Sequence, residues 1–321
     1  MLILAIGDPH SKISNINDLQ LLAAEILSII SDKKPDAVVI LGDLHDYFER
    51  AHLQAWNSMV KFLDKISSAI QTYYIIGNHC SINNQIFLTD EHFFNAFKKW
   101  KNLTIVDKPR WLADNVLLVP YTPPGRFMEA LETSGGWDMA DVIFAHQEFF
   151  GAQMGPIVST VGDTWDDDYP LVVSGHIHDR QWVGATVYYT GTPYQTSFGD
   201  KGEKSVALVD SKSGFITEIP IVTVPKRVSI KVTCAEFKNI TLSVGNHYRV
   251  TINDTSENIN SLKKTSKYKE ISTIAKLILV PLDSAQVTKK TSKTDGYIDI
   301  LKKTIAKESN LVQSLAEEVL K

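Results

Sequence analysis

Eight polar residues that suit metal-assisted chemistry follow short apolar runs along this chain. They offer carboxylate and amide oxygens together with imidazole nitrogens, a mixed ligand set that suits manganese, iron or zinc. Several such ligands with one bridging carboxylate can hold two ions that polarise a phosphoryl group and generate hydroxide at neutral pH. In chain order the eight residues are Asp8, His10, Asp43, Asn78, His79, His146, His176 and His178.

Each motif means little by itself. A lone Gly-Asp after a strand is usually a turn, and a lone His-x-His is more often a surface pair. Here DPH, GDLHD, GNH, a single histidine and GHIH occur in succession, each at the end of an apolar run. Ligands in α/β sheets gather at the carboxyl ends of strands. The joint pattern therefore predicts a metal site.

The apolar runs predict the sheet that must position these residues. Continuous Val/Ile/Leu runs are typical of strands covered on both faces. Helical patterns between the first three runs predict an α/β arrangement, and the sequence from Gln181 onward favours hairpins. The expected strands are 2–8, 37–43, 72–78, 141–147 and 170–176, and the expected helices are 16–31, 51–70, 90–101 and 123–131.

The charge of the chain is unevenly distributed. Residues 226–321 contain 17 Lys+Arg and 10 Asp+Glu, which leaves 16 and 27 for residues 1–225 from the totals of 33 and 37. An acidic front part suits cations, and a basic rear part suits a polyanion, although a solvated lysine-rich surface gives the same count.

Composition favours a reducing, non-membrane setting. No apolar run looks long enough to span a bilayer, and the N-terminus lacks the basic region of a signal peptide. Two cysteines, Cys80 and Cys234, form no disulfide framework. We therefore expect a cytoplasmic protein without a membrane partner.

The C-terminal third predicts three further segments. Residues 226–282 favour a small α+β domain with a helix near 259–267, and 283–295 is a polar, lysine-rich linker. Residues 296–321 carry apolar side chains at three- and four-residue spacing, which predicts a helix that docks on a partner or packs on its own protein.

The ordered motifs DPH, GDLHD, GNH, H and GHIH resemble those of the calcineurin-like metallophosphoesterase superfamily. The stretch YYTGTPYQTSFGDKGEKSVALVD, residues 188–210, is similar to the end of the phosphoesterase core in SbcD-type DNA repair nucleases, especially phage recombination endonuclease subunits. The resemblance covers about residues 1–225. It implies an α+β fold with a four-layer αββα sandwich, a small DNA-binding capping domain at 226–282, and a C-terminal helix that docks on an ATPase.

The resemblance also implies roles for individual residues. Asp43 would bridge two divalent ions, most often Mn²⁺ in this family, with Mg²⁺, Fe²⁺ or Zn²⁺ as alternatives. His79 would contact the scissile phosphate and protonate the leaving oxygen. The remaining ligands would be Asp8, His10 and His178 for one ion, and Asn78, His146 and His176 for the other.

Two positions depart from the family's usual motifs. His45 stands where a bulky apolar residue is common, and we interpret it as a packed loop residue. Cys80 stands where GNHD is usual. Asp46, three residues after Asp43, provides another carboxylate that we expect to hydrogen-bond His79, raise its pKa and fix its ring. The alternative is that Asp46 is an ordinary loop acid.

The resemblance favours a DNA exonuclease or endonuclease that acts on double-stranded ends and single strands. Such nucleases are homodimers that work with an SbcC-type coiled-coil ATPase in the cytoplasm, or in the host cytoplasm when a phage encodes them. The same ligands serve small-molecule phosphoesterases, such as nucleotide phosphatases and cyclic-nucleotide phosphodiesterases. A non-catalytic scaffold is a third hypothesis, against which the intact ligand set argues.

Overall fold

The computed structural model describes residues 1–48, 51–200 and 202–282, which form two compact units. Unit 1 comprises Met1–Val228 and Val244–His247, and unit 2 comprises Ser229–Ser243 and the chain from Tyr248 onward. The expected boundary at residue 225 lies three positions before the end of the first segment. The expected linker 283–295 and helix 296–321 lie outside the described residues.

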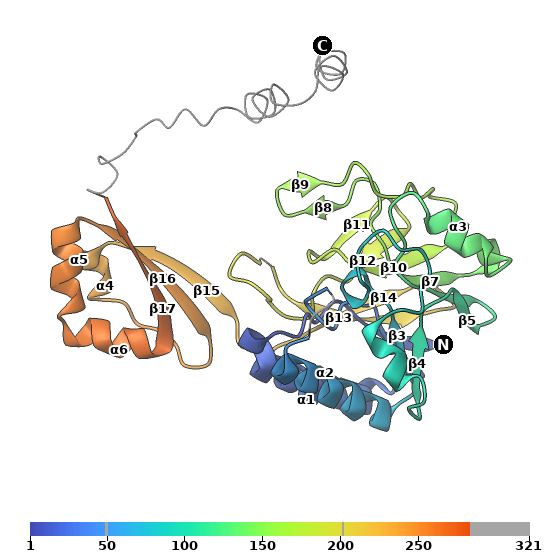
Figure 1. Ribbon diagram of the computed structural model, residues 1–321, viewed down its shortest axis with the longest axis horizontal. Helices are drawn as coiled ribbons and strands as arrows, with labels where there is room; N and C mark the ends of the chain where they lie inside the picture. Colours follow the sequence, from blue (N-terminus) through green and yellow to red (C-terminus); the bar gives the residue numbers. More distant parts are fainter. Residues whose placement is uncertain (49–50, 201, 283–321) are drawn as a thin grey trace, which may run out of the picture. The chain divides into compact units, whose positions relative to one another are not determined.

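Unit 1 contains two six-stranded mixed sheets (Figure 1). Four neighbouring strands run parallel in each sheet. In the first sheet the two remaining strands lie side by side at one edge, each antiparallel to its neighbour, whereas the second sheet has one antiparallel strand at each edge. The first sheet has the order β14 (Ile216–Pro220), β13 (Ser205–Asp210), β1 (Leu2–Ile6), β2 (Ala37–Ile40), β3 (Thr72–Ile75) and β4 (Leu103–Val106). The second has the order β11 (Gln181–Val183), β12 (Val187–Tyr189), β10 (Leu171–Gly175), β7 (Val142–His146), β6 (Val116–Val119) and β5 (Arg110–Ala113).

Alternation of side chains along the strands builds the layers. On β1, Ile3 and Ala5 join a core formed by residues of both sheets, whereas Leu4 and Ile6 join the core under α1 and α2. Both faces of the strand are therefore apolar, as its continuous apolar sequence predicts. Helix α3 (Phe127–Glu132) contributes to a third core on the far face of the second sheet. The four layers are therefore α1 with α2, the first sheet, the second sheet and α3.

The helices that flank the first sheet differ in part from the prediction. Helices α1 (Ile16–Lys33) and α2 (Leu53–Ala69) lie where expected and pack together (Figure 1). The helix expected at 90–101 is wrong, because only the 3-10 element η3 (Phe93–Phe97) forms there. The buried Phe94 and Phe97 produce the apolar spacing that suggested a helix. Asn102, however, adopts a left-handed conformation with φ of 58° and leads into β4.

The helix expected at 123–131 begins four residues later, at Phe127. The two prolines precede it instead of opening it. The carboxylate of Asp163, 36 positions away in sequence, accepts a hydrogen bond from the Phe127 backbone N–H at 3.1 Å. A cap supplied from so far along the chain cannot be seen in the local sequence.

The other short elements of unit 1 are η1 (Ile13–Asn15), η2 (Asn78–Cys80), η4 (Trp137–Met139) and the hairpin strands β8 (Gln153–Met154) and β9 (Ile157–Val158).

One described helical stretch, Ile13–Lys33, is long and apolar enough to cross a membrane by length and composition alone. The expectation that no such run exists is therefore wrong on that criterion. The stretch includes α1, whose Leu19, Leu22 and Ile26 are fully buried in the core that α1 shares with α2 and the first sheet. A core helix of this kind meets the same criterion.

Unit 2 is a three-stranded sheet with helices on one face. Its strands have the order β15 (Arg227–Val232), β16 (His247–Asp254) and β17 (Ala275–Pro281), and β16 and β17 run parallel. Val250, Ile252 and Ile271 contribute to its buried core. The helix expected near 259–267 is divided at Thr265, whose hydroxyl accepts a hydrogen bond from Tyr268 N–H and caps a new helix. The helices are α4 (Cys234–Phe237), α5 (Ser256–Lys263) and α6 (Ser266–Ile274).

Candidate metal centre

The strand order of unit 1 brings the polar strand ends together. Strands β1, β2 and β3 are parallel neighbours, so the residues that follow them meet at one edge of the first sheet. Strands β7 and β10 are parallel neighbours in the second sheet and end in the same way. Because the two sheets share a core, the two edges meet. Three ligand groups result: Asp8, His10 and His178; His10, Asp43 and His79; Asp43, His146 and His176.

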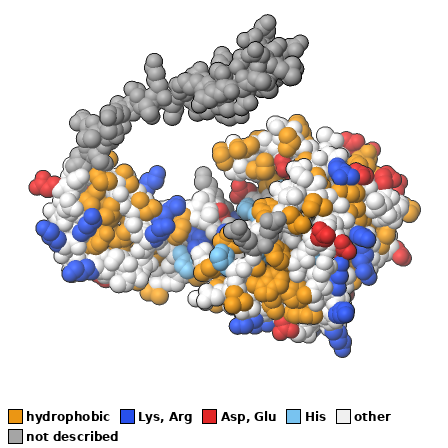
Figure 2. Space-filling model, in the orientation of Figure 1, with side chains coloured by type: hydrophobic (Ala, Val, Ile, Leu, Met, Phe, Trp, Pro, Cys, Tyr) orange, Lys and Arg blue, Asp and Glu red, His pale blue; other side chains and the backbone are white. Residues whose placement is uncertain are grey.

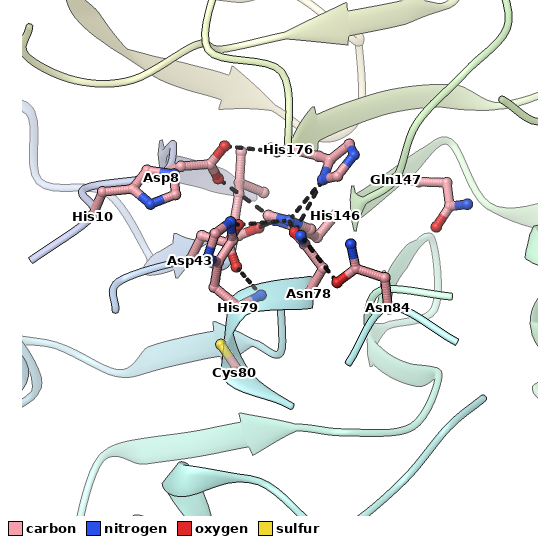
Figure 3. A network of polar contacts seen from close by, with 12 residues as sticks. Asp8, His10, Asp43, Asn78, His79, Cys80, Asn84, His146, Gln147 and His176 are labelled. Carbon is pink, nitrogen blue, oxygen red and sulfur yellow. Dashed lines mark hydrogen bonds and ion pairs between the residues drawn. The ribbon is translucent and has the colours of Figure 1, made fainter. Parts of the chain in front are cut away.

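One group of electron-pair donors converges around Asn78. Its Oδ1 lies 2.9 Å from His146 Nε2 and 3.1 Å from His176 Nδ1, and those two nitrogens are 3.3 Å apart (Figure 3). His146 Nδ1 donates to the Leu41 carbonyl at 2.7 Å, so Nε2 is free to present a lone pair. Such a set of lone pairs repels unless a proton or a metal ion lies among them.

The second group lies around His10. Its Nε2 is 2.9 Å from His178 Nε2, and Asp8 supplies the third ligand atom, all within 4.8 Å of one another. Asp8 is fully buried, and its Oδ1 has no hydrogen-bond partner among the described residues. An unpaired buried carboxylate oxygen is costly, and metal coordination removes that cost. The donor set therefore fits two divalent cations.

Asp43 lies between the two groups. Its Oδ2 is 3.3 Å from His146 Nε2, and its Oδ1 accepts a hydrogen bond from the His79 backbone N–H at 3.0 Å. Although burial raises the pKa of Asp43, the imidazoles of His146, His79 and His10 hold it well below the usual range. Asp43 is therefore a carboxylate at neutral pH and is placed to serve both groups.

Supporting contacts that the sequence did not reveal hold the ligands in place. Asn78 Nδ2 donates to Asn84 Oδ1 at 3.5 Å, which turns Asn78 Oδ1 toward the histidines (Figure 3). Glu148 Oε2 lies 3.7 Å from His176 Nε2. The Tyr121 ring packs 5.7 Å from the His176 ring. Neither Asn84 nor Tyr121 belongs to a recognisable motif, so no signal in this sequence could have identified them.

The expected carboxylate contact between Asp46 and His79 is wrong. His79 Nδ1 makes its hydrogen bond, at 3.0 Å, with the backbone carbonyl of Asp46. The Asp46 carboxylate instead lies 3.1 Å from His10 Nδ1 and accepts a hydrogen bond from Lys12 Nζ at 3.1 Å. The pKa of His79 is lowered, because burial outweighs the opposing effect of Asp43. Asp46 thus adjoins His79, but its side chain serves the His10 group.

The ring of His79 is fixed by its neighbours. Besides its bond to Asp46, it stacks on the Phe48 ring at 4.4 Å with an interplanar angle of 25°. The His10 ring meets it edge-on at 5.2 Å. Its Nε2 lies 3.9 Å from Asp43 Oδ2, so the free nitrogen is the one nearest the converging ligands.

Cys80 does not replace an acid beside the ligands. Its side chain points away from the converging ligands (Figure 3). It is buried in the core under α1 and α2, where its sulfur lies 3.0 Å from the Tyr74 hydroxyl. Burial raises the pKa of the Cys80 thiol far above its ordinary value. The thiolate that oxidants attack is therefore disfavoured, contrary to the sensitivity that an exposed thiol beside a redox metal would have.

His45 is a buried packing residue, as its position in the loop suggested. Its Nδ1 contacts the Tyr47 backbone, and its ring lies 5.2 Å from the Phe93 ring. Its Nε2 is buried without a hydrogen-bond partner among the described residues. The rings of Tyr47 and Trp56 also lie near it, so His45 is packed among aromatic side chains.

Comparison with known proteins gives the family. Residues 1–180, more than half of the chain, match the family described as calcineurin-like phosphoesterase. This chain is a calcineurin-like phosphoesterase. Members of this family are metal-dependent hydrolases that typically bind two divalent ions, as the donor groups of this phosphoesterase also indicate.

Two viral proteins are similar over most of this phosphoesterase. "Putative phosphoesterase 078R" of Invertebrate iridescent virus 3 is 38% identical over 285 residues, covering 84% of this chain and 81% of the relative. "Putative phosphoesterase 244L" of Invertebrate iridescent virus 6 is 37% identical over 260 residues, covering 78% and 92%. Their names specify phosphoesterase and no substrate.

Solved structures show weaker likeness to this phosphoesterase. A protein described as a novel archaeal phosphodiesterase matches 69% of this chain and 100% of its own, with 15% identity and a TM-score of 0.37. Similarity at that level supports no statement about substrate or partner.

Proposed function

We propose that this phosphoesterase is a two-metal phosphodiesterase that hydrolyses DNA. The observation that carries the phosphodiesterase assignment is the convergence of oxygen and nitrogen ligands in two groups beside the shared carboxylate Asp43. Divalent ions in such a site act as Lewis acids toward a phosphoryl group. Asp8, His10 and His178 would hold one ion, and Asn78, His146 and His176 the other.

His79 supplies the proton in this proposal. Hydrolysis adds water oxygen to phosphorus and breaks the bond to the leaving sugar oxygen, which must gain a proton. His79 Nδ1 is engaged by the Asp46 carbonyl, so its Nε2 is the atom that delivers the proton. Burial lowers the pKa of His79 in the protein alone. A phosphodiester anion beside the ring favours its protonated form and counteracts that effect.

DNA as substrate is supported by charge and by the sequence resemblance at 188–210. Residues 226–321 have 17 basic and 10 acidic side chains, which suits a polyanion. Docking of residues 296–321 on a coiled-coil ATPase, a homodimeric state and a cytoplasmic location remain part of the proposal. The two free, buried cysteines are consistent with a reducing compartment.

A small-molecule phosphoesterase is the second candidate. It is favoured by the charge of residues 1–225, where 27 acidic side chains face 16 basic ones. A net negative charge on this part of the chain repels a long polyanion more than it repels a single phosphate ester.

The decisive experiment incubates the protein with Mn²⁺ and either linear DNA or a chromogenic phosphodiester. We expect DNA cleavage that His79→Ala reduces at least a hundredfold while the bound manganese stays unchanged, because general acid catalysis contributes about 10²–10⁴. Hydrolysis of the small ester alone would support the second candidate. Inactivity on both substrates with manganese bound, and with the ATPase added, would support a scaffold.

A further inference from the structure

Among the six non-bridging ligand candidates, His178 has an unusual environment. The second ring nitrogen of His10 faces Asp46, that of His146 bonds Leu41, and that of His176 faces Glu148. In the part of the chain that the structure describes, no hydrogen bond or ion pair engages the second ring nitrogen of His178. The residue is also exposed, unlike its partners Asp8 and His10. Its position must therefore be set through its backbone.

Two donors hold that backbone. The carbonyl oxygen of His178 accepts a hydrogen bond from Thr192 N–H at 3.2 Å and a second from the ammonium of Lys204 at 3.2 Å. Lys204 Nζ also donates to Thr192 Oγ1 at 2.9 Å. Lysine thus ties the loop after β10 to the loop after β12, and it does so at the ligand residue itself.

Lys204 makes no ion pair within 4.0 Å among the described residues, although the more distant carboxylates of Asp200 and Asp179 favour its charged form. Both of its hydrogen-bond partners, the His178 carbonyl and the Thr192 hydroxyl, are neutral. A half-buried ammonium whose direct hydrogen-bond partners are a carbonyl and a hydroxyl is costly to desolvate. Retaining it is reasonable if the position of the His178 carbonyl matters.

Close packing on the other side leaves the His178 carbonyl little freedom. Gly191 has φ of 67°, and a Cβ there would lie 2.9 Å from His178 O and 2.8 Å from Arg180 N. Glycine therefore allows the second loop to approach the His178 backbone, and the lysine fixes that approach. This arrangement gives a physical role to part of the 188–210 stretch.

We propose that Lys204 is a positioning residue for the metal ligand His178. It acts through the His178 carbonyl and the Thr192 hydroxyl. This backbone contact does for His178 what a partner on the second ring nitrogen does for the other ligand histidines. Groups that orient metal ligands typically contribute 10–100-fold to metal affinity. The inference rests on the metal site of the phosphoesterase and not on DNA as its substrate.

The test measures Mn²⁺ binding to the metal-free full-length protein by calorimetry, with Co²⁺ absorption spectra as a second readout. We expect Lys204→Met to weaken binding at one of two sites about tenfold and to alter the Co²⁺ spectrum. Lys204→Arg, which keeps a cationic donor, should recover part of the affinity. Lys204 and His178 line a cavity of about 240 Å³, which leaves room for the substituted side chains.

Lys212→Met is the matched control, because Lys212 is exposed in the turn between β13 and β14 and its loss changes net charge equally. It should leave both sites unchanged. A Lys204→Met protein with a lowered melting temperature but unaltered metal affinity and spectrum would overturn the proposal. If that variant does not fold, Lys204→Ala removes both contacts without filling the space with a long side chain, and unaltered metal binding in it would count equally against the proposal. Neither result depends on whether DNA is cleaved.

Discussion

At the residue scale, the metal ligands are oriented by other residues that are not themselves ligands. The clearest example is Asp46, which sequence reasoning placed beside His79 through its carboxylate. The structure uses its carbonyl for His79 and its carboxylate for His10 and Lys12. One residue can therefore support both the proposed proton donor and a metal ligand.

The protonation of His146 predicts how metal binding depends on pH. Although burial alone would lower it, the carboxylates of Asp43 and Asp8 raise the pKa of His146 to about 9 in the metal-free protein. Below that pH the ring carries a proton that a metal must displace from Nε2. Burial also raises the pKa of the ligand candidate Asp8 to about 7. Affinity should therefore rise with pH, by about tenfold per unit near pH 8 and more steeply near pH 6.

Calorimetry in buffers of different ionisation enthalpy checks this prediction, because it counts the protons released on Mn²⁺ binding. We expect about one proton from His146 at pH 7 to 8. His247→Gln is a suitable control, since His247 pairs with Asp18 and not with any ligand. An affinity that stays constant from pH 6 to 8 would exclude this linkage.

At the element scale, the tight turns after the strands place the ligands. Three non-glycine ligand candidates have positive φ: 44° at His10, 40° at Asp43 and 78° at His176. Such conformations cost about 1–3 kcal/mol each and cluster at functional sites. The strain is consistent with turns shaped to direct side chains into one place.

The glycine before Asn78 is required by close packing and gives an element-scale prediction. A Cβ on Gly77 would overlap Asp43 Oδ1 and come 2.8 Å from the Asp43 backbone nitrogen. Gly77→Ala should displace the bridging carboxylate, weaken Mn²⁺ binding at least tenfold and lower stability by about 1–3 kcal/mol.

Calorimetry and thermal melting measure both effects of Gly77→Ala. The control is Gly199→Ala, because a Cβ there meets only Ser197 Oγ at 3.4 Å, an ordinary contact. If Gly77→Ala binds Mn²⁺ as tightly as the parent protein, the turn is more adaptable than its geometry indicates.

At the scale of the whole molecule, charge distinguishes the two units. Unit 2 carries lysine and arginine side chains across the face seen in Figure 2. On its sheet, Lys231 and Lys276 are exposed and alternate with core-facing neighbours such as Val232 and Leu277. Both lysines therefore lie on the sheet face opposite the helices.

If DNA is the substrate, these lysines should contribute to its binding. Replacing Lys231 and Lys276 together by alanine should reduce the slope of log affinity against log salt by up to about 2, since each phosphate contact contributes about 0.9. Fluorescence anisotropy with labelled duplex DNA, measured with Ca²⁺, gives that slope. The double variant Lys99→Ala, Lys101→Ala in unit 1 is the control. If the slope of log affinity against log salt is the same in the two double variants, unit 2 does not form part of the DNA interface.

The sequence by itself determined the ligand types, their order and their place at strand ends. Those features depend on local patterns: apolar runs form buried strands, and glycine before a polar residue marks the turn that follows. The same local reasoning failed at residues 90–101, where buried aromatics at helical spacing occur in one short 3-10 element followed by turns.

Only the tertiary structure decided which atoms meet. His178 faces His10 across 168 positions, and Asp46 lies 33 positions from His79. The contact of Glu148 with His176 depends on the pairing of β7 with β10, and that of Lys204 with His178 on how the two sheets pack against each other. Local sequence carries no record of such distances, because they are set by which strands pair and how closely their ends approach.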